Sequence, residues 1–284
     1  MNRNDFCEEL KRNNMFSEEF ENDYNEFSNY QNIIIDCLKE FHRVCEKNEI
    51  NYELAWGSLL GAIRDNGIIP WDYDIDVFVP FTQREDLVSA LHKDLNERFY
   101  IYCIEENEKC RHVYMRIAPK GFNCEVFHMD VFFLAGVPEG IDREQLAKRI
   151  SLLSNIHSDK LIKANLITRH PFLITERIIK KLKCLKYKIP KLRTEYYSLC
   201  KLESLFKSKE CIHGDAFAAD YVFPTEILYP TILFKTDSGE FRIPKNYEKA
   251  LKLMYGDYLS IPPLNNRIEE IRVHLHRLRK WGKK

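Results

Sequence analysis

The chain has 284 residues, of which 45% are hydrophobic and 30% are charged, so it can bury a sizeable core and is not a disordered segment. Its 43 Lys and Arg residues are balanced by 43 Asp and Glu residues, which excludes the strongly basic surface that a nucleic-acid partner calls for. The apolar runs are shorter than the roughly 20 residues that cross a bilayer, and the start is too acidic for a signal peptide. We therefore expect a cytoplasmic protein that binds no nucleic acid.

The nine cysteines form an odd set without a C-x-x-C pair, which favours reduced thiols over a disulfide framework. The alternative is a zinc site, because thiolates and imidazoles are the ligands that zinc prefers. Its candidate ligands are Cys103, Cys110, Cys124, His112 and His128. We favour core packing for these cysteines, because they lie in segments that alternate like strands.

The hydrophobic pattern predicts alternating helices and strands through the first half of the chain. Apolar residues at three- and four-residue steps predict an amphipathic helix over 26–47. The elements that follow are predicted as a strand at 51–56, a short helical segment through 63, a strand at 74–79, a helix at 83–98, and strands at 100–105, 112–117 and 124–134.

From 142 to about 209 the pattern becomes helical and basic, with a Lys-rich run at 180–186. A solvated face is the preferred interpretation of these charges, and contact with a phosphorylated or membrane-linked substrate is the alternative. The last part predicts strands at 221–223 and 240–243 and helices at 246–255 and 267–280.

Two aspartates in the predicted strand 74–79 indicate a metal site. Alternate side chains of a strand share a face, so Asp74 and Asp76 project together while Ile75 and Val77 point to the opposite side. Carboxylates this close repel one another unless a cation lies between them, and a hard cation such as Mg²⁺ is the natural occupant. A lone D-x-D is common by chance, so the pair needs supporting context.

That context is a Gly-Ser turn upstream and a third acid downstream. Gly57 and Ser58 open a short helical segment whose backbone N–H groups can hold a phosphate. Asp130 lies within an otherwise apolar run, where an unpaired carboxylate would be costly, so we expect a cation beside it. Together these residues predict a metal site next to an anion site, as a nucleotide phosphate requires.

With these motifs the sequence resembles the LicD family. That family includes bacterial phosphocholine transferases and fukutin-related transferases, and it belongs to the polymerase-beta-like nucleotidyltransferase superfamily. The resemblance covers about 30–263 and rests on 57–76, on Asp130, and on the C-terminal runs 222–224, 242–247 and 253–258. Two departures stand out. Tyr73 replaces an acid found in many relatives, and Phe234-Lys235-Thr236 replaces an expected Phe-Glu-Gly, which leaves the donor or acceptor open.

The resemblance implies an α/β (α+β) fold with a nucleotidyltransferase-like mixed sheet, a helical insertion and a C-terminal extension. The implied division is an N-terminal helical segment at 1–48, the catalytic core at 49–140, a Lys-rich helical subdomain at 141–212 and an extension packed on the core at 213–284.

It also implies a Mg²⁺-dependent transferase, with Mn²⁺ as an alternative ion. Such an enzyme moves phosphocholine or a similar phospho-alcohol from a CDP-linked donor such as CDP-choline to a sugar hydroxyl of a surface glycan or lipid-linked sugar, and releases CMP. The glycan would be a lipopolysaccharide, capsule or teichoic acid, and the reaction would take place in the cytoplasm or at the inner face of the membrane. The alternatives are a nucleotidyltransferase that releases pyrophosphate, a D-x-D glycosyltransferase that releases UDP or GDP, and a catalytically inactive scaffold in glycan assembly.

Carried over by position, Asp74, Asp76 and Asp130 look like the catalytic, metal-binding acids. Gly57 and Ser58 look like the phosphate-holding turn. Asp130 is also the candidate base for the acceptor hydroxyl, with His128 as its rival.

Three further side chains are candidates for donor binding. Arg64 is the first candidate for a phosphate clamp, with an ion pair to Asp72 as the structural alternative, and Arg116 is the second. If the donor carries choline, Trp71 is the candidate aromatic face for the quaternary ammonium. Trp56 and Tyr73 also flank the motif, and packing is the better interpretation for Trp56.

Overall fold

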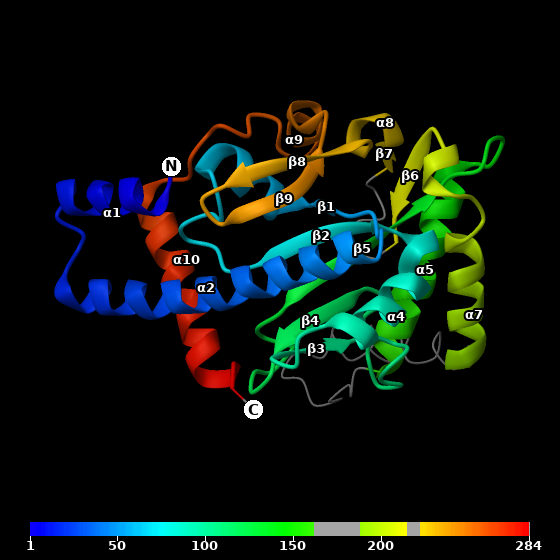
Figure 1. The fold of residues 1–284 in the computed structure, drawn as a ribbon, viewed down its shortest axis with the longest axis horizontal. Coiled ribbons are helices and arrows are strands. Elements are labelled where there is room, and N and C mark those ends of the chain that lie inside the picture. Colours follow the sequence, from blue (N-terminus) through cyan, green and yellow to red (C-terminus); the bar gives the residue numbers. More distant parts are fainter. Residues whose placement is uncertain (162–187, 215–221, 284) are drawn as a thin grey trace, which may run out of the picture.

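The computed structural model describes residues 1–161, 188–214 and 222–283 and contains a seven-stranded mixed sheet with helices packed around it (Figure 1). This confirms the predicted α/β class. The sheet runs in the order β1-β2-β5-β4-β3, with β6 paired to β5 and β7 paired to β6. Its strands are β1 (Glu53–Leu54), β2 (Ile75–Pro80), β3 (Phe99–Tyr102), β4 (Met115–Pro119), β5 (Met129–Gly136), β6 (Glu210–His213) and β7 (Val222–Pro224).

The parallel pair of β2 and β5 forms the centre of this sheet. Their register sets Asp76 opposite Asp130, so the two predicted acids begin neighbouring strands at the same edge. The other edge of β5 pairs first with β4 and then with β6. Residues Ile75, Val77 and Val79 are almost fully buried on the apolar face of β2, which leaves the opposite face for the polar side chains.

The helices lie around this sheet, and a separate hairpin follows it in the chain. The 30-residue helix α2 contacts β2, β4 and β5, and α10 crosses α2 (Figure 1). The described helices are α1 (Arg3–Arg12), α2 (Glu18–Lys47), α3 (Trp56–Leu60), α4 (Arg84–Asp94), α5 (Arg143–Leu161), α7 (Ile189–Cys200), α8 (Thr225–Leu228), α9 (Tyr247–Tyr255) and α10 (Leu264–Trp281). The hairpin consists of β8 (Thr231–Thr236) and β9 (Gly239–Pro244).

The N-terminal helices extend beyond the prediction. Helix α2 begins at Glu18 rather than at 26, because Ser17 caps it and Phe20 and Tyr24 continue its buried stripe. Helix α1 lies within the helical segment implied at 1–48 but was not defined as a separate helix, and its capping box of Asn2 and Asp5 is the signal that could have done so.

Several predicted boundaries are wrong. The strand predicted at 51–56 is reduced to two residues, because the backbone at Trp56 turns to φ 45° and starts α3. The strand predicted at 124–134 begins only at Met129, after a turn closed by the side chain of Asn123. Strand β6 was predicted as helix and β8 was not predicted, and α4 ends four residues before the predicted 98.

The basic middle of the chain is only partly described. Helices α5 and α7 confirm its helical character on either side, whereas the Lys-rich run at 180–186 lies outside the described residues. None of the helices in the described ranges combines the length and the apolar character that crossing a bilayer requires. The eight cysteines of these ranges are free thiols.

Candidate active site

Four aspartates gather where β2 and β5 begin. Asp72 and Asp74 lie on the loop that enters β2, Asp76 is the second residue of β2, and Asp130 is its partner on β5. Paired strands lie about 4.8 Å apart, so the carboxylates of Asp76 and Asp130 share one small volume. The structure therefore brings the three predicted acids together and adds Asp72, which sequence analysis missed as a member of the group. Its signal was the alternating pattern Asp72-x-Asp74-x-Asp76.

The cluster is electrostatically unfavourable on its own. Burial and the charges of Asp130, Asp74 and Asp72 raise the pKa of Asp76 well above its usual value. The pKa of Asp74 is raised for the same reasons, by desolvation and then by Asp72 and Asp130, although its side chain is exposed to solvent at the rim. Neither Asp74 nor Asp76 forms an ion pair within the described part of the chain. A bound cation would relieve this repulsion.

Asp130 differs from its neighbours because an arginine and a histidine lie against its carboxylate. His128 Nε2 and Arg116 Nε each lie 3.2 Å from Asp130 Oδ1. Burial raises the pKa of Asp130, but His128 and Arg116 outweigh it and hold that pKa below its usual value. Asp130 therefore stays ionised beside the two raised carboxyls.

Arg116 lies at the site as predicted, but its guanidinium is already engaged. Besides Asp130, it donates to Glu125 Oε2 at 3.0 Å and to the Tyr114 hydroxyl at 3.0 Å. Burial lowers the pKa of Arg116, and the neighbouring Asp130 and Glu125 more than offset this and raise it. Its observed contacts orient Asp130 rather than present a free donor to a phosphate.

The Gly57-Ser58 turn also lies against the acids. Ser58 Oγ accepts a hydrogen bond from the Asp76 backbone N–H at 2.8 Å, and the Ser58 N–H donates to the Ala55 carbonyl. A Cβ at Gly57 would lie 3.3 Å from Asp72 Oδ2, so a glycine lets the turn approach this carboxylate closely. The turn is placed as predicted, but Ser58 directs its polar groups to the backbone and positions Asp76.

Arg64 and Trp71 are both engaged in contacts within the fold, and their roles in donor binding stay predictions. Arg64 pairs with Asp65 at 2.8 Å rather than with Asp72, because the fully buried Asp65 carboxylate requires a cation. Trp71 is 3% exposed and is enclosed by the guanidinium groups of Arg64 and Arg267, at 5.5 and 5.0 Å. Both residues stabilise the loop that leads to the acids.

Tyr73 and Trp56 also have structural neighbours. The Tyr73 hydroxyl donates to the Val126 carbonyl at 3.2 Å, so it is engaged within the fold. Trp56 packs edge-to-face on Phe78 and Phe223, which agrees with the preferred packing role.

Helix α10 brings a cation to the rim that sequence analysis missed. The His274 ring lies 4.7 Å from the Tyr73 ring, and Arg277 follows one turn later on the same face of the helix. Arg277 is exposed, forms no ion pair with any described residue, and counteracts the raised pKa of Asp74. The helix was predicted, but its sequence does not reveal which loop it crosses.

The donor chemistry of the cluster fits a hard divalent cation. Carboxylate oxygens are the ligands that Mg²⁺ prefers, and Asp74, Asp76 and Asp130 supply them from two elements. Across residues 1–161, 188–214 and 222–283, no three His, Cys, Asp or Glu side chains form a ready-made metal site. The carboxylates would have to draw closer around an ion. The same finding leaves the alternative zinc site without support.

Comparison with known proteins identifies the region that contains these acids. Residues 49–134 match the family described as LicD/FKTN/FKRP, nucleotidyltransferase domain. The lipopolysaccharide cholinephosphotransferase LicD of Haemophilus influenzae is 26% identical over 254 residues, which cover 82% of this chain and 91% of that protein.

Two uncharacterized rickettsial proteins show short local matches. The protein of Rickettsia prowazekii is 48% identical over 44 residues, which are 16% of each chain. That of Rickettsia typhi is 43% identical over 44 residues, which are 16% of this chain and 14% of the relative. The matched domain contains the Gly-Ser turn and all four aspartates, and the match to the Haemophilus protein runs through most of both chains. Residues 49–134 thus resemble the LicD/FKTN/FKRP nucleotidyltransferase domain, and most of the chain is similar to a LicD protein.

Proposed function

We propose that this chain is a LicD-type phosphotransferase that moves phosphocholine, or a similar phospho-alcohol, from a CDP-linked donor to a sugar hydroxyl of a surface glycan. The observation that carries the proposal is the convergence of Asp74, Asp76 and Asp130 within the domain matched to the family. The 26% identity to a lipopolysaccharide cholinephosphotransferase supports phosphocholine as the group and a glycan as the acceptor.

The proposed reaction is a single displacement at phosphorus. The acceptor hydroxyl oxygen forms a bond to the phosphorus that carries choline, and the bond from that phosphorus to the bridging oxygen of CMP breaks. CMP leaves with the bridging oxygen and its electron pair, and the hydroxyl proton passes to a carboxylate of the site. Mg²⁺, held by Asp74, Asp76 and Asp130, would neutralise charge on the phosphates.

The residues of the chain have distinct tasks in this scheme. Ser58 fixes the backbone of Asp76, and Arg116 and His128 fix the carboxylate of Asp130, which we assign as the proton acceptor. Arg277 takes the role of phosphate clamp that sequence analysis gave to Arg64, because it is the cation left unpaired at the rim within the described residues.

We place the reaction in the cytoplasm, at the inner face of the membrane when the acceptor is lipid-linked. The balance of acidic and basic residues gives no general attraction to anionic lipids. Any membrane contact would therefore be peripheral and local.

Product analysis tests the proposal. The protein is incubated with Mg²⁺, a glycan acceptor and, in turn, CDP-choline, CDP-ribitol, CDP-glycerol, UDP-sugars and nucleoside triphosphates. We expect CMP from one CDP-alcohol and no product from the same reaction in EDTA. Pyrophosphate from a triphosphate would favour nucleotidyl transfer, and UDP would favour glycosyl transfer. Binding of a CDP-alcohol without turnover under any condition would favour the scaffold.

A further inference from the structure

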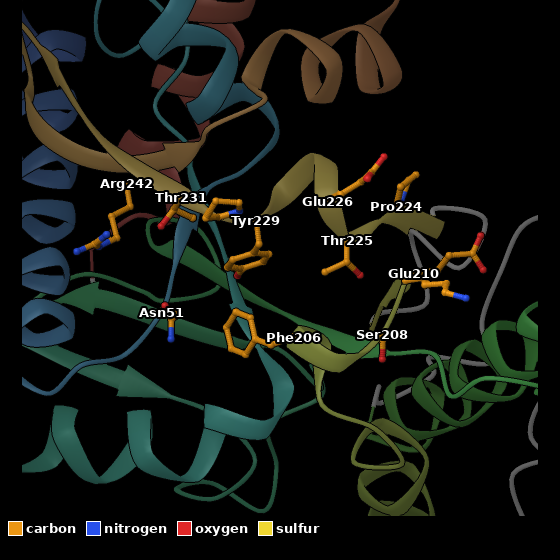
Figure 2. A pocket seen from close by; sticks show the side chains of 12 residues that line it. Asn51, Phe206, Ser208, Glu210, Pro224, Thr225, Glu226, Tyr229, Thr231 and Arg242 are labelled. Carbon is orange, nitrogen blue, oxygen red and sulfur yellow. The ribbon is translucent and has the colours of Figure 1, made fainter.

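A large groove of the described residues is lined by none of the four aspartates. It has a volume of about 900 Å³ and is bordered by the segment before β1, by residues 206–210, and by the chain from β7 through α8 to the start of β8 (Figure 2). Pockets of this size accommodate ligands much larger than an ion or a water cluster. None of the acids of the proposed reaction borders it.

An aromatic pair forms the centre of the groove wall. The rings of Phe206 and Tyr229 meet edge-to-face with centroids 5.3 Å apart, and Phe206 is 51% exposed although it is a large hydrophobic residue. Figure 2 shows them side by side, with Thr225 pointing toward them and Glu226 pointing away. The face of an aromatic ring carries partial negative charge and attracts polarised C–H groups, such as those of a sugar ring.

The remaining lining combines hydrogen-bonding groups with balanced charge. The charged lining residues are two basic and two acidic side chains, Lys209, Arg242, Glu210 and Glu226, and three of these four pair with residues outside the groove. A polyanion or polycation therefore gains no net attraction there. Asn51, Ser208, Thr225 and Thr231 supply amide and hydroxyl groups, which suit a neutral polyhydroxylated ligand.

The groove is poorly suited to an added peptide strand. Strand addition needs a row of backbone N–H and C=O groups along the groove. Pro224 and Pro230 occupy the wall and have no N–H group to donate.

Buried polar groups without hydrogen-bond partners at this wall of the groove are an independent indication that it binds a ligand. The Tyr229 hydroxyl and both carboxylate oxygens of Glu53 are buried without a hydrogen-bond partner among the described residues. Such groups cost about 1–3 kcal/mol each, so natural proteins keep few of them, often at functional sites. They would be satisfied by a water or a ligand hydroxyl admitted past Tyr229.

We propose that this groove binds a neutral saccharide segment of the acceptor glycan, away from the hydroxyl that reacts. The role as acceptor subsite rests on the proposed function, whereas saccharide binding itself does not. The exposed ring of Phe206, which packs on Tyr229, forms the stacking surface, and Asn51, Ser208 and Thr231 provide the hydrogen bonds.

The test compares the wild-type chain with Phe206→Ala and with the control Leu202→Ala, which removes a similarly exposed side chain that does not line the groove. Binding of a panel of neutral tri- and tetrasaccharides is measured by saturation-transfer NMR and calorimetry. At least one member binds the wild type, Phe206→Ala weakens it roughly tenfold, and Leu202→Ala leaves it unchanged.

Absence of binding by every saccharide, or equal binding by Phe206→Ala, overturns the proposal. So does a change in oligomeric state in Phe206→Ala alone, since it would assign the groove to a second copy of the chain. Where a CDP-alcohol is turned over, Phe206→Ala raises KM for the glycan and leaves KM for the donor unchanged. Saccharide binding without turnover of any donor would contradict the proposed function and leave the groove assignment standing.

Discussion

Replacing Asp76 by Asn distinguishes the effect of this carboxylate on the stability of the fold from its effect on turnover. The substitution removes one charge and almost no volume. Two carboxylates about 5 Å apart repel by about 3 kcal/mol at an effective dielectric constant of about 20. Asp76 is partly accessible to water, and Arg116 and His128 already neutralise much of Asp130, so the net repulsion is smaller. We expect Asp76→Asn to raise the free energy of unfolding by about 1–2 kcal/mol in EDTA.

Urea denaturation at neutral pH, with EDTA or with excess Mg²⁺, measures this effect. The wild type gains stability in Mg²⁺ because the ion binds only the folded state, and Asp76→Asn loses most of that gain. Turnover falls by at least about a hundredfold, since loss even of groups that only orient metal ligands costs 10- to 100-fold. The exposed Asp257→Asn is the control for general loss of a negative charge. Equal stability of Asp76→Asn and wild type in EDTA, with equal gains in Mg²⁺, would refute the reasoning.

Three further substitutions test separate parts of the structure. Glu53 is fully buried, and burial raises the pKa of its carboxyl, so the group stays neutral in the folded protein. In the unfolded chain the same carboxyl ionises near pH 4.3, so the free energy of unfolding falls as the pH rises from there toward the pKa of the folded protein. Glu53→Gln is therefore more stable than wild type by about 1–2 kcal/mol at pH 8, and parallel denaturation curves from pH 4 to pH 8 would contradict this. Arg277→Ala weakens binding of CDP-choline and of inorganic pyrophosphate about tenfold in calorimetry, whereas Arg272→Ala, on another face of α10 beside Phe20, changes it less than twofold. Arg84 is fully buried and pairs with Glu105 at 2.7 Å, so Arg84→Met lowers the free energy of unfolding by about 3 kcal/mol, and adding Glu105→Gln recovers part of the loss.

Hydrophobic and polar patterns in the sequence predicted those structural features that depend on residues close together in the chain. The alternation around Asp74 and Asp76 predicts a strand that places Asp76 opposite a buried apolar face, and β2 does so, although Phe78 on the Asp76 side is buried as well. An acid in an apolar run needs a cation, and Asp130 pairs with Arg116 and also lies beside His128. The amphipathic stripe of α2 was also sufficient, although its first turns were missed, where Phe20 and Tyr24 continue the stripe at helical spacing.

Contacts between distant segments could not be predicted. Arg64 seemed available for a phosphate, but it pairs with the buried Asp65, which the N-terminal amine of Met1 also contacts from the far end of the sequence. Arg116 seemed available as well, and a strand pattern cannot show that Glu125 and Tyr114 will surround its guanidinium. Arg277 was missed because its proximity to the aspartates depends on where α10 crosses their loop. That crossing follows from tertiary packing and not from the sequence of the helix.

The loop that leads to the aspartates is braced by segments from opposite ends of the sequence. Trp71 lies between Phe6 of α1, with ring centroids 5.5 Å apart, and Arg267 of α10. Arg267 also joins the two helices through Glu9, at 2.7 Å. These braces all lie outside 49–134, the stretch that carries the family match. Excising that stretch as a minimal catalytic fragment would remove the support of its own reaction centre, so engineering for new donors has to start from the chain with both terminal helices in place.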